Sequence, residues 1–269
     1  MFPLSGREFP QSGSELALAI EKALGEVMVL AAGRPAVTVA GEGFPTVASI
    51  DVNLDGASIR TDALPPRPVG VGDRRTGISV GQAKLSGHPI RHQQARLELD
   101  MSGRGLVFDY DRDANGSPLL VLKSAEAGDV RASVLMSDLQ ALALEAATLG
   151  AKQQGVAIQE LQLSLASDGP RAVTAHVRVK AKKMMMSGVI HLRGRLSIDE
   201  RLNATVSQLS CVGEGMVGNA AAAMLQKKVQ EFEGRTIALT AFSLGDVALR
   251  DLQIQVDNAV RVTAAFGSR

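Results

Sequence analysis

The chain has 269 residues, with 29 Lys and Arg against 28 Asp and Glu, so its formal net charge is +1. This balance argues against a dedicated nucleic-acid binder, because contact with phosphates needs a surplus of basic residues. A single cysteine excludes an internal disulfide bond, and four histidines leave little for a zinc site, so neither a metal nor another cofactor is expected.

The N-terminal segment has neither the pattern of a signal peptide nor that of a membrane span. Arg7 and Glu8 come too early, and further charges between residues 21 and 26 interrupt the apolar residues. We therefore expect a soluble protein, in the cytoplasm or peripheral to a membrane. Residues 1–34 are predicted as an N-terminal helix and residues 35–269 as one domain.

The first helix is predicted from about Ser14 to Ala32. Ser12 and Glu15 have the spacing of a capping box. Apolar residues then recur every three or four positions, which is typical of one helix face. They are Leu16, Ile20, Ala23, Val27 and Leu30. Gly33 and Pro35 end this helix.

A strand-rich block is predicted next. Apolar and polar residues alternate around Ile50–Leu54 and Leu97–Leu99, and Asn115-Gly116 is a hairpin turn signal. Residues 65–75 combine Pro, Gly and charge without periodicity, so they are predicted as a loop.

Two more helices are predicted, each between groups of strands. One follows a strand over Val130–Met136, begins with a capping box at Ser137 and Gln140, and is followed by Gly155. The other spans Met216–Phe232. Strands are expected around residues 161–165, 173–179 and 202–206, with three more between residues 237 and 266. This order indicates an α+β fold, in which a long curled antiparallel sheet wraps around amphipathic helices.

Gly213 to Gly218 matches the pattern G-x-G-x-x-G, which binds dinucleotides where a parallel strand leads into a helix. The neighbouring strands are predicted to be antiparallel, and Glu214 would bring a carboxylate next to the pyrophosphate. We therefore interpret these glycines as the start of a packed helix, with a close helix–sheet approach at Gly218. A nucleotide-dependent enzyme is kept as a third functional alternative.

Other sequence patterns that could bind a metal are incomplete. Asp111 to Gly116 resembles the start of a calcium loop, but its twelfth position is Leu122 instead of glutamate, so a hairpin turn is favoured. His88 and His92 are four residues apart, yet Pro89 between them excludes a helix, and a third ligand is lacking.

Catalytic patterns are missing as well. Cys211 has no neighbouring histidine. The acidic pair Asp199-Glu200 falls in a turn, without the apolar surroundings that raise a carboxyl pKa. The sequence therefore predicts a protein without catalysis.

A basic run over residues 176–183, followed by three methionines, suggests a surface for anionic lipid headgroups. Alternation puts part of the run on one face of a strand, where the plainer interpretation is a solvated sheet face. The headgroup candidates are Arg178, Lys180, Lys182 and Lys183.

The apolar stripes of the second and third helices could stand off the sheet and leave a slot for an acyl chain. The small residues of the third helix, Gly218 and Ala220–Ala223, would line such a slot without filling it. The predicted lipid-binding residues are Leu139, Leu142, Ala146, Leu149, Ala221, Met224, Leu225 and Val229. Leu142→Trp or Ala221→Trp is then expected to block ligand uptake in a protein that still folds.

Three segments carry a family resemblance. They are Gly43-Phe44-Pro45 with Val47–Leu54, Gly56 and Ile59; Gly77–Val80 with Leu85; and Gly128–Leu139. This pattern resembles the bacterial LmeA-like lipid-binding proteins, relatives of the tubular lipid-binding (TULIP) superfamily, over roughly residues 35–232. The resemblance implies a curled sheet around a long helix, with a hydrophobic groove for a phospholipid. Residues 235–269 lie outside it.

We therefore predict a protein that binds a phospholipid or similar amphiphile in a groove between helices and sheet, and that can act as a lipid carrier. Its expected partners are a lipid or hydrophobic small molecule and, transiently, a membrane surface. The alternative is a structural or assembly protein, with a fully packed core and self-association through a strand edge.

Overall fold

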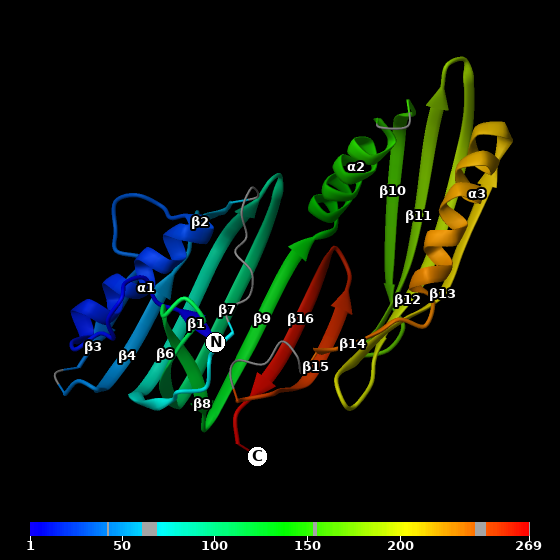
Figure 1. Ribbon diagram of the computed structural model, residues 1–269. Helices are drawn as coiled ribbons and strands as arrows, with labels where there is room; N and C mark the ends of the chain where they lie inside the picture. Colours follow the sequence, from blue (N-terminus) through cyan, green and yellow to red (C-terminus); the bar gives the residue numbers. More distant parts are fainter. Residues whose placement is uncertain (42, 61–68, 153–154, 240–245, 269) are drawn as a thin grey trace. The chain divides into compact units, whose positions relative to one another are not determined.

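The computed structural model describes residues 1–41, 43–60, 69–152, 155–239 and 246–268. The chain forms two compact units (Figure 1). Unit 1 comprises Met1–Ser133, Thr240–Leu252 and Val262–Arg269, and unit 2 comprises Val134–Leu239 and Gln253–Arg261. The predicted division into residues 1–34 and 35–269 stays a prediction.

Over the described residues, one large sheet has eleven strands, and its main path runs β15-β16-β9-β7-β6-β4-β3. The strands are β1 (Phe2–Pro3), β2 (Met28–Val29), β3 (Val37–Ala40), β4 (Thr46–Asn53), β5 (Ser58–Ile59), β6 (Arg75–His92), β7 (Ala95–Arg112), β8 (Pro118–Ser124), β9 (Ala127–Leu135), β15 (Leu249–Val256) and β16 (Ala259–Phe266). The long β6–β7 hairpin is antiparallel, whereas β6 is parallel to β4 and β5. The predicted α+β class is confirmed, while the wrapping of a curled sheet around the helices stays a prediction.

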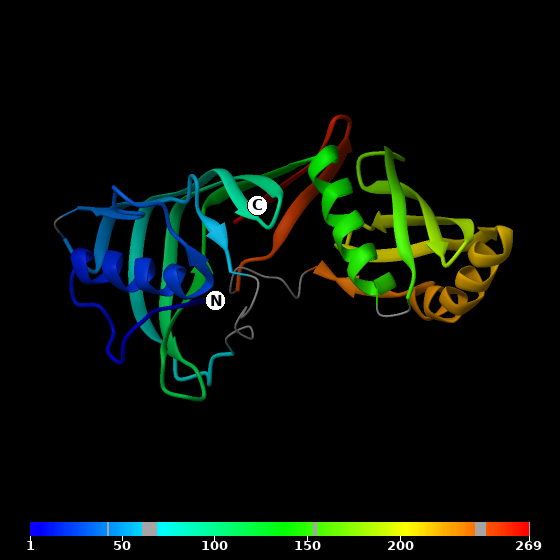
Figure 2. The ribbon, with the colours of Figure 1, turned by 90° about the horizontal axis from the view of Figure 1, so that it is seen from above.

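Helix α1 (Gly13–Val27) lies along one face of the large sheet in unit 1 (Figure 2). The hydroxyl of Ser12 accepts the N–H of Glu15 at 3.2 Å, so the predicted cap is confirmed. The predicted end at Ala32 is wrong. Met28 and Val29 instead form β2 and pair with β5, because tertiary strand pairing overrides the helical pattern there.

Unit 2 contains a five-stranded antiparallel sheet in the order β10-β11-β12-β13-β14. Its strands are β10 (Ala157–Ser167), β11 (Ala172–Lys183), β12 (Met186–Ile198), β13 (Asn203–Glu214) and β14 (Thr236–Ala238). Helix α2 (Met136–Lys152) packs on β10, and α3 (Gly215–Phe232) packs mainly on β12 and β13. Both helices contribute to one apolar cluster around Leu161, Val179 and Ile190, so they cover the same sheet face.

The predicted helix boundaries in unit 2 are nearly correct. The capping box at Ser137 is wrong, because α2 already begins at Met136 and the Ser137 hydroxyl donates to Asp138. Gly155 follows α2 with a φ of 67°, as predicted for a glycine after a helix. Of the predicted loop over residues 65–75, residues 65–68 lie outside the described residues. Residues 69–74 form no helix or strand apart from an isolated bridge between Gly70 and Asp113, as predicted, and β6 begins at Arg75.

Candidate functional site

An apolar pocket of about 250 Å³ lies within unit 1, between α1 and the large sheet. We call it the α1 pocket. Its lining comprises Met1, Phe2, Ile20, Leu24, Ile50, Val52, Ala83, Lys84, Leu85, Met101, Gly103, Leu106, Phe108, Leu120, Leu122 and Phe266. Of the described residues that line it, Lys84 alone is charged.

Small residues in neighbouring strands explain why space remains beneath α1. Strand register aligns Ile50 of β4 with Ala83 of β6, and Ala83 with Gly103 of β7. Two of these three inward positions therefore carry little or no side chain. Ala83 lines the pocket, whereas Leu106 and Phe266 fill the space beside Gly103. A Cβ at Gly103 would lie 2.9 Å from Leu106 Cδ2 and 3.3 Å from Phe266 Cζ, so this position has little room for a side chain.

A polar depression lies on the same strands and includes Asp51, Ser86, Asp100, Ser102 and Asp129. Successive side chains of a strand point to opposite faces. These polar residues alternate with Val52, Leu85 and Met101 of the α1 pocket, so they belong to the other face of the sheet. The sheet therefore separates an apolar site from a polar surface.

The apolar lining of the α1 pocket suits hydrocarbon. Its described lining contains no His, Cys, Asp or Glu that could transfer a proton or attack a substrate. Each buried CH₂ of a ligand contributes about 0.8 kcal/mol, so six methylenes would contribute ~5 kcal/mol before ordering costs.

The predicted lipid-binding residues lie in unit 2 and do not line the α1 pocket. Ala221, Leu225 and Val229 of α3 and Leu139 and Leu142 of α2 are half-buried. Ala146, Leu149 and Met224 are exposed. The two helices meet the sheet through the small or short side chains of Ala143, Ala147 and Ala221, with Leu225. The role of the eight predicted residues in lipid binding stays a prediction.

The glycines of residues 213–218 bring α3 against the sheet. A Cβ at Gly218 would overlap the carbonyl oxygen of Val189, and one at Gly213 would overlap the carbonyl of Gly218. The neighbouring strands β12 and β13 are antiparallel. The interpretation as a close helix–sheet approach is confirmed, and the backbone of β12 leaves no slot beside Gly218.

Three of the four predicted headgroup residues, Arg178, Lys180 and Lys182, lie on the face of β11 opposite α2 and α3. The register places Arg178 beside His191, and the rings of His176 and His191 stack with centroids 5.7 Å apart. Arg178 is 3.8 Å from Glu160, which partly neutralises it. Lys183 ends β11 and adjoins the hairpin turn.

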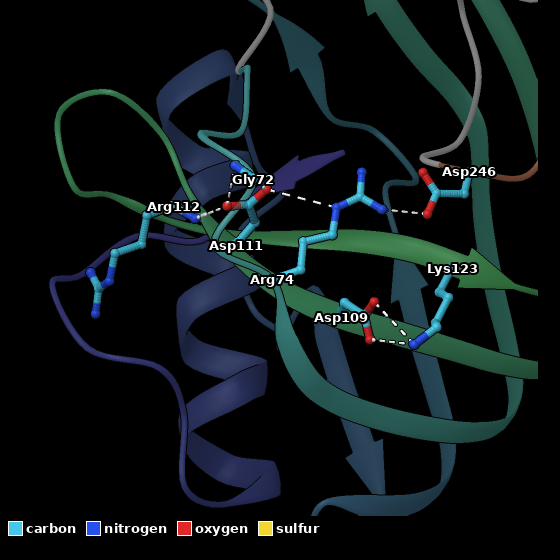
Figure 3. Close-up of polar contacts among 7 residues, drawn as sticks. All are labelled: Gly72, Arg74, Asp109, Asp111, Arg112, Lys123 and Asp246. Carbon is cyan, nitrogen blue, oxygen red and sulfur yellow. Dashed lines mark hydrogen bonds and ion pairs between the residues drawn. The ribbon is translucent and has the colours of Figure 1, made fainter.

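A second polar cluster in unit 1 has a structural explanation (Figure 3). The buried carboxylate of Asp111 accepts the N–H groups of Gly72 and Arg112, and Asp109 pairs with Lys123 at 3.3 Å. Arg74 joins Asp111 to Asp246, whose hydrogen bond raises the pKa of Arg74. The cluster attaches the residues just before β6, Gly72 and Arg74, to Asp111 of β7. These contacts use the Asp111 carboxylate that the calcium-loop pattern would have assigned to a metal ion.

Other titratable groups are explained by their local contacts. The hydrogen bond to Asp100, 3.0 Å long, raises the pKa of His88. Burial raises the pKa of the Cys211 thiol, which disfavours the reactive thiolate. Burial also raises the pKa of Tyr110 to about 12. Within the described ranges, no group of three His, Cys, Asp or Glu residues could hold a metal ion.

None of the helices in the described part of the chain combines the length and apolar character that a membrane crossing requires. Comparison with known proteins gives no match to a family model, a curated protein or a solved structure.

The sequence pattern predicted the apolar stripe of α1, including Ile20, but not the pocket beneath it. The small residues Ala83 and Gly103 on adjacent strands were the available signal, and only strand register aligns them.

Proposed function

We propose that this protein binds a hydrocarbon chain of a phospholipid or similar amphiphile in the α1 pocket, and that it serves as a lipid carrier without catalysis. The observation that carries the proposal is the apolar lining of a pocket large enough for part of one chain. Its volume lies just below the roughly 300–1,000 Å³ of small-molecule sites. The resemblance of residues 43–139 to LmeA-like proteins supports the same ligand class.

The proposal places the protein in the cytoplasm or at the periphery of a membrane. It relocates the bound chain from the predicted groove beside α2 and α3 to unit 1, because α1 buries larger side chains than α2 or α3 and still leaves a pocket. The TULIP-like arrangement of sheet and helix belongs to the proposal.

The test fills the pocket from the sheet side. Ala83→Phe places a ring beneath α1 and is expected to remove most co-purified lipid, measured by organic extraction and mass spectrometry of the full chain. Gln82→Phe is the matched control, because Gln82 is exposed on the opposite face of β6. Overpacking costs about 1–3 kcal/mol, so the thermal midpoint of each variant is measured first.

A third variant separates the two candidate sites. Ala221→Trp obstructs the α3 face of unit 2 and is expected to leave the lipid content unchanged. Lipid loss in Ala221→Trp, with normal lipid in Ala83→Phe, would return the site to the residues predicted from the sequence. Absence of lipid from the wild-type protein, together with failure to bind a fluorescent phospholipid, would contradict the proposal itself.

Self-association is the second candidate function. Strand β10 pairs with β11 alone among the described strands, so one edge of this eleven-residue strand can accept another strand. The Gln140 side chain partly covers that edge, by accepting the N–H of Leu163 at 3.5 Å. A mass that rises with concentration in light scattering would favour this function over a monomeric carrier.

A further inference from the structure

One end of unit 2 gathers exposed methionines and lysines from three chain segments. The β11–β12 hairpin turns there, and the last paired residues before its turn are Lys183 and Met186. Lys182 pairs with Ala157, so the start of β10 and the nearby end of α2 lie at the same end. The N-terminus of α3 lies there too, because a Cβ at Gly215 would come within 3.2 Å of the Ser187 carbonyl oxygen. Figure 1 shows these segments together at the upper end of unit 2.

The turn itself has an unusual composition. Two-residue hairpin turns favour Asn-Gly or Asp-Gly, because their backbone needs positive φ. Here the turn is Met184-Met185, and Met184 has a φ of 54°, which L side chains with a Cβ rarely adopt. Local stability does not explain methionine at these positions, so a contact outside the unit is the better explanation.

Several apolar side chains at this end are largely exposed. Met184 is 86% exposed, Met185 is 97% exposed, and Met216 at the start of α3 is 72% exposed. Methionine is flexible and polarisable, and it adapts to irregular apolar surroundings. Together these side chains form a small apolar protrusion. A protrusion suits insertion into the acyl layer of a membrane better than binding in a rigid pocket.

Lysines accompany these methionines. Lys152, Lys180, Lys182 and Lys183 lie in the same segments, and no carboxylate of the described residues is within ion-pair distance of any of the four. Glu214, at the same end, pairs with His191 at 3.2 Å. Lysines beside an exposed apolar protrusion are complementary to a membrane, in which anionic headgroups cover an apolar acyl layer.

We propose that the end formed by Lys182–Met186 and Met216, here called the methionine–lysine tip, docks on an anionic bilayer, with methionines in the apolar layer and lysines at the headgroups. The role of the tip as the surface where a lipid carrier takes up its lipid rests on the proposed function. Binding of the tip to vesicles can be measured independently of that function. Arg178, which lies further from the hairpin turn along β11, is not needed for contact.

The chain contains no tryptophan, so one introduced tryptophan is a unique probe. The emission of Met185→Trp is expected to shift to shorter wavelength when vesicles of equimolar phosphatidylcholine and phosphatidylglycerol are added. Val69→Trp, at an exposed apolar position of unit 1, is the matched control and is expected to show no shift. Pure phosphatidylcholine vesicles are expected to produce no shift in either protein.

Vesicle flotation of the full chain then separates charge from insertion. Lys182→Gln with Lys183→Gln is expected to weaken partitioning about 25-fold, or about fivefold for each lysine. Lys227→Gln with Lys228→Gln is the matched control, because this exposed pair lies twelve residues, or ~18 Å, further along α3 from its first residue. Met184→Ser with Met185→Ser is expected to abolish the part of the binding that persists at high salt.

Equal partitioning of the tip variants and the wild type would overturn the inference, as would a wild type that fails to float with anionic vesicles. A dimer that the methionine variants lose, without vesicle binding, would assign the tip to contact between two copies. Tip variants that keep their co-purified lipid but lose vesicle binding would support both proposals. Vesicle binding by a wild type without pocket lipid would support the tip and contradict the proposed function.

Discussion

Unit 1 and unit 2 both place amphipathic helices on one face of a sheet, but they bury those helices to different degrees. Helix α1 buries five side chains, among them Leu16 and Ile20, in the core of unit 1. In α2 the one buried residue is Asp138, and the leucines of its stripe are half-buried or exposed. An apolar stripe therefore shows which side of a helix faces the sheet, whereas the opposing residues decide how deeply it is buried.

The same comparison places the two candidate surfaces. In unit 1, Ile20 and Leu24 of α1 line an apolar pocket together with the small Ala83 of the sheet. In unit 2, Gly218 brings α3 against the backbone of β12, and the large apolar side chains of Met216, Met224 and Phe232 remain exposed. Loose packing beneath a helix produces a pocket, and tight packing through small residues produces an exposed apolar surface.

The largest expected effect is on core leucines. Leu16→Ala removes a fully buried side chain and is expected to lower the free energy of unfolding by about 3 kcal/mol. Leu149→Ala, at an α2 position that is 61% exposed, is expected to change it by less than about 0.5 kcal/mol. Urea unfolding measures both values. Similar losses in the two variants would contradict the difference in burial between α1 and α2.

Glycine substitutions sharpen the contrast within unit 2. Gly218→Ala would force a methyl group onto the backbone of β12 and is expected to cost about 2 kcal/mol. Gly150→Ala in α2 meets no atom within 4 Å, so the better helix propensity of alanine is expected to add about 0.5–1 kcal/mol. Thermal unfolding compares them, and a stabilised Gly218→Ala would show that α3 does not depend on close contact.

The smallest expected effect concerns the exposed His88 in unit 1. The Asp100 hydrogen bond raises its pKa in the folded protein, so protonated His88 adds stability below its unfolded pKa. That contribution is lost as the pH rises through the folded pKa. The difference in stability between the wild type and His88→Gln is therefore expected to be present near about pH 6 and absent above about pH 8.

Asp100→Asn provides the control for this pH dependence. It replaces the Asp100 carboxylate, whose hydrogen bond and negative charge raise the pKa of His88, with a neutral amide and is expected to abolish most of the same difference. A stability difference that persists unchanged at alkaline pH would assign the effect of His88→Gln to packing instead of protonation.

Sequence patterns located the secondary structure better than the site. The range of α3 differs from its prediction by one residue, and the antiparallel hairpin at Asn115-Gly116 is as predicted. The end of α1 was missed because Met28 and Val29 pair with residues thirty positions away. The α1 pocket was missed because it depends on residues from α1, from the five strands β1, β4, β6, β7 and β8, and on Phe266.

By itself the sequence determined which stretches are amphipathic, where helices and turns begin, and which glycines allow close packing, because these properties depend on neighbours within a few residues. Tertiary structure decided which apolar stripe is buried, where an internal space remains, and which exposed methionines and lysines share one end of unit 2. Those outcomes depend on strand register, which joins residues far apart in the chain and sets the size of the side chain opposite each position.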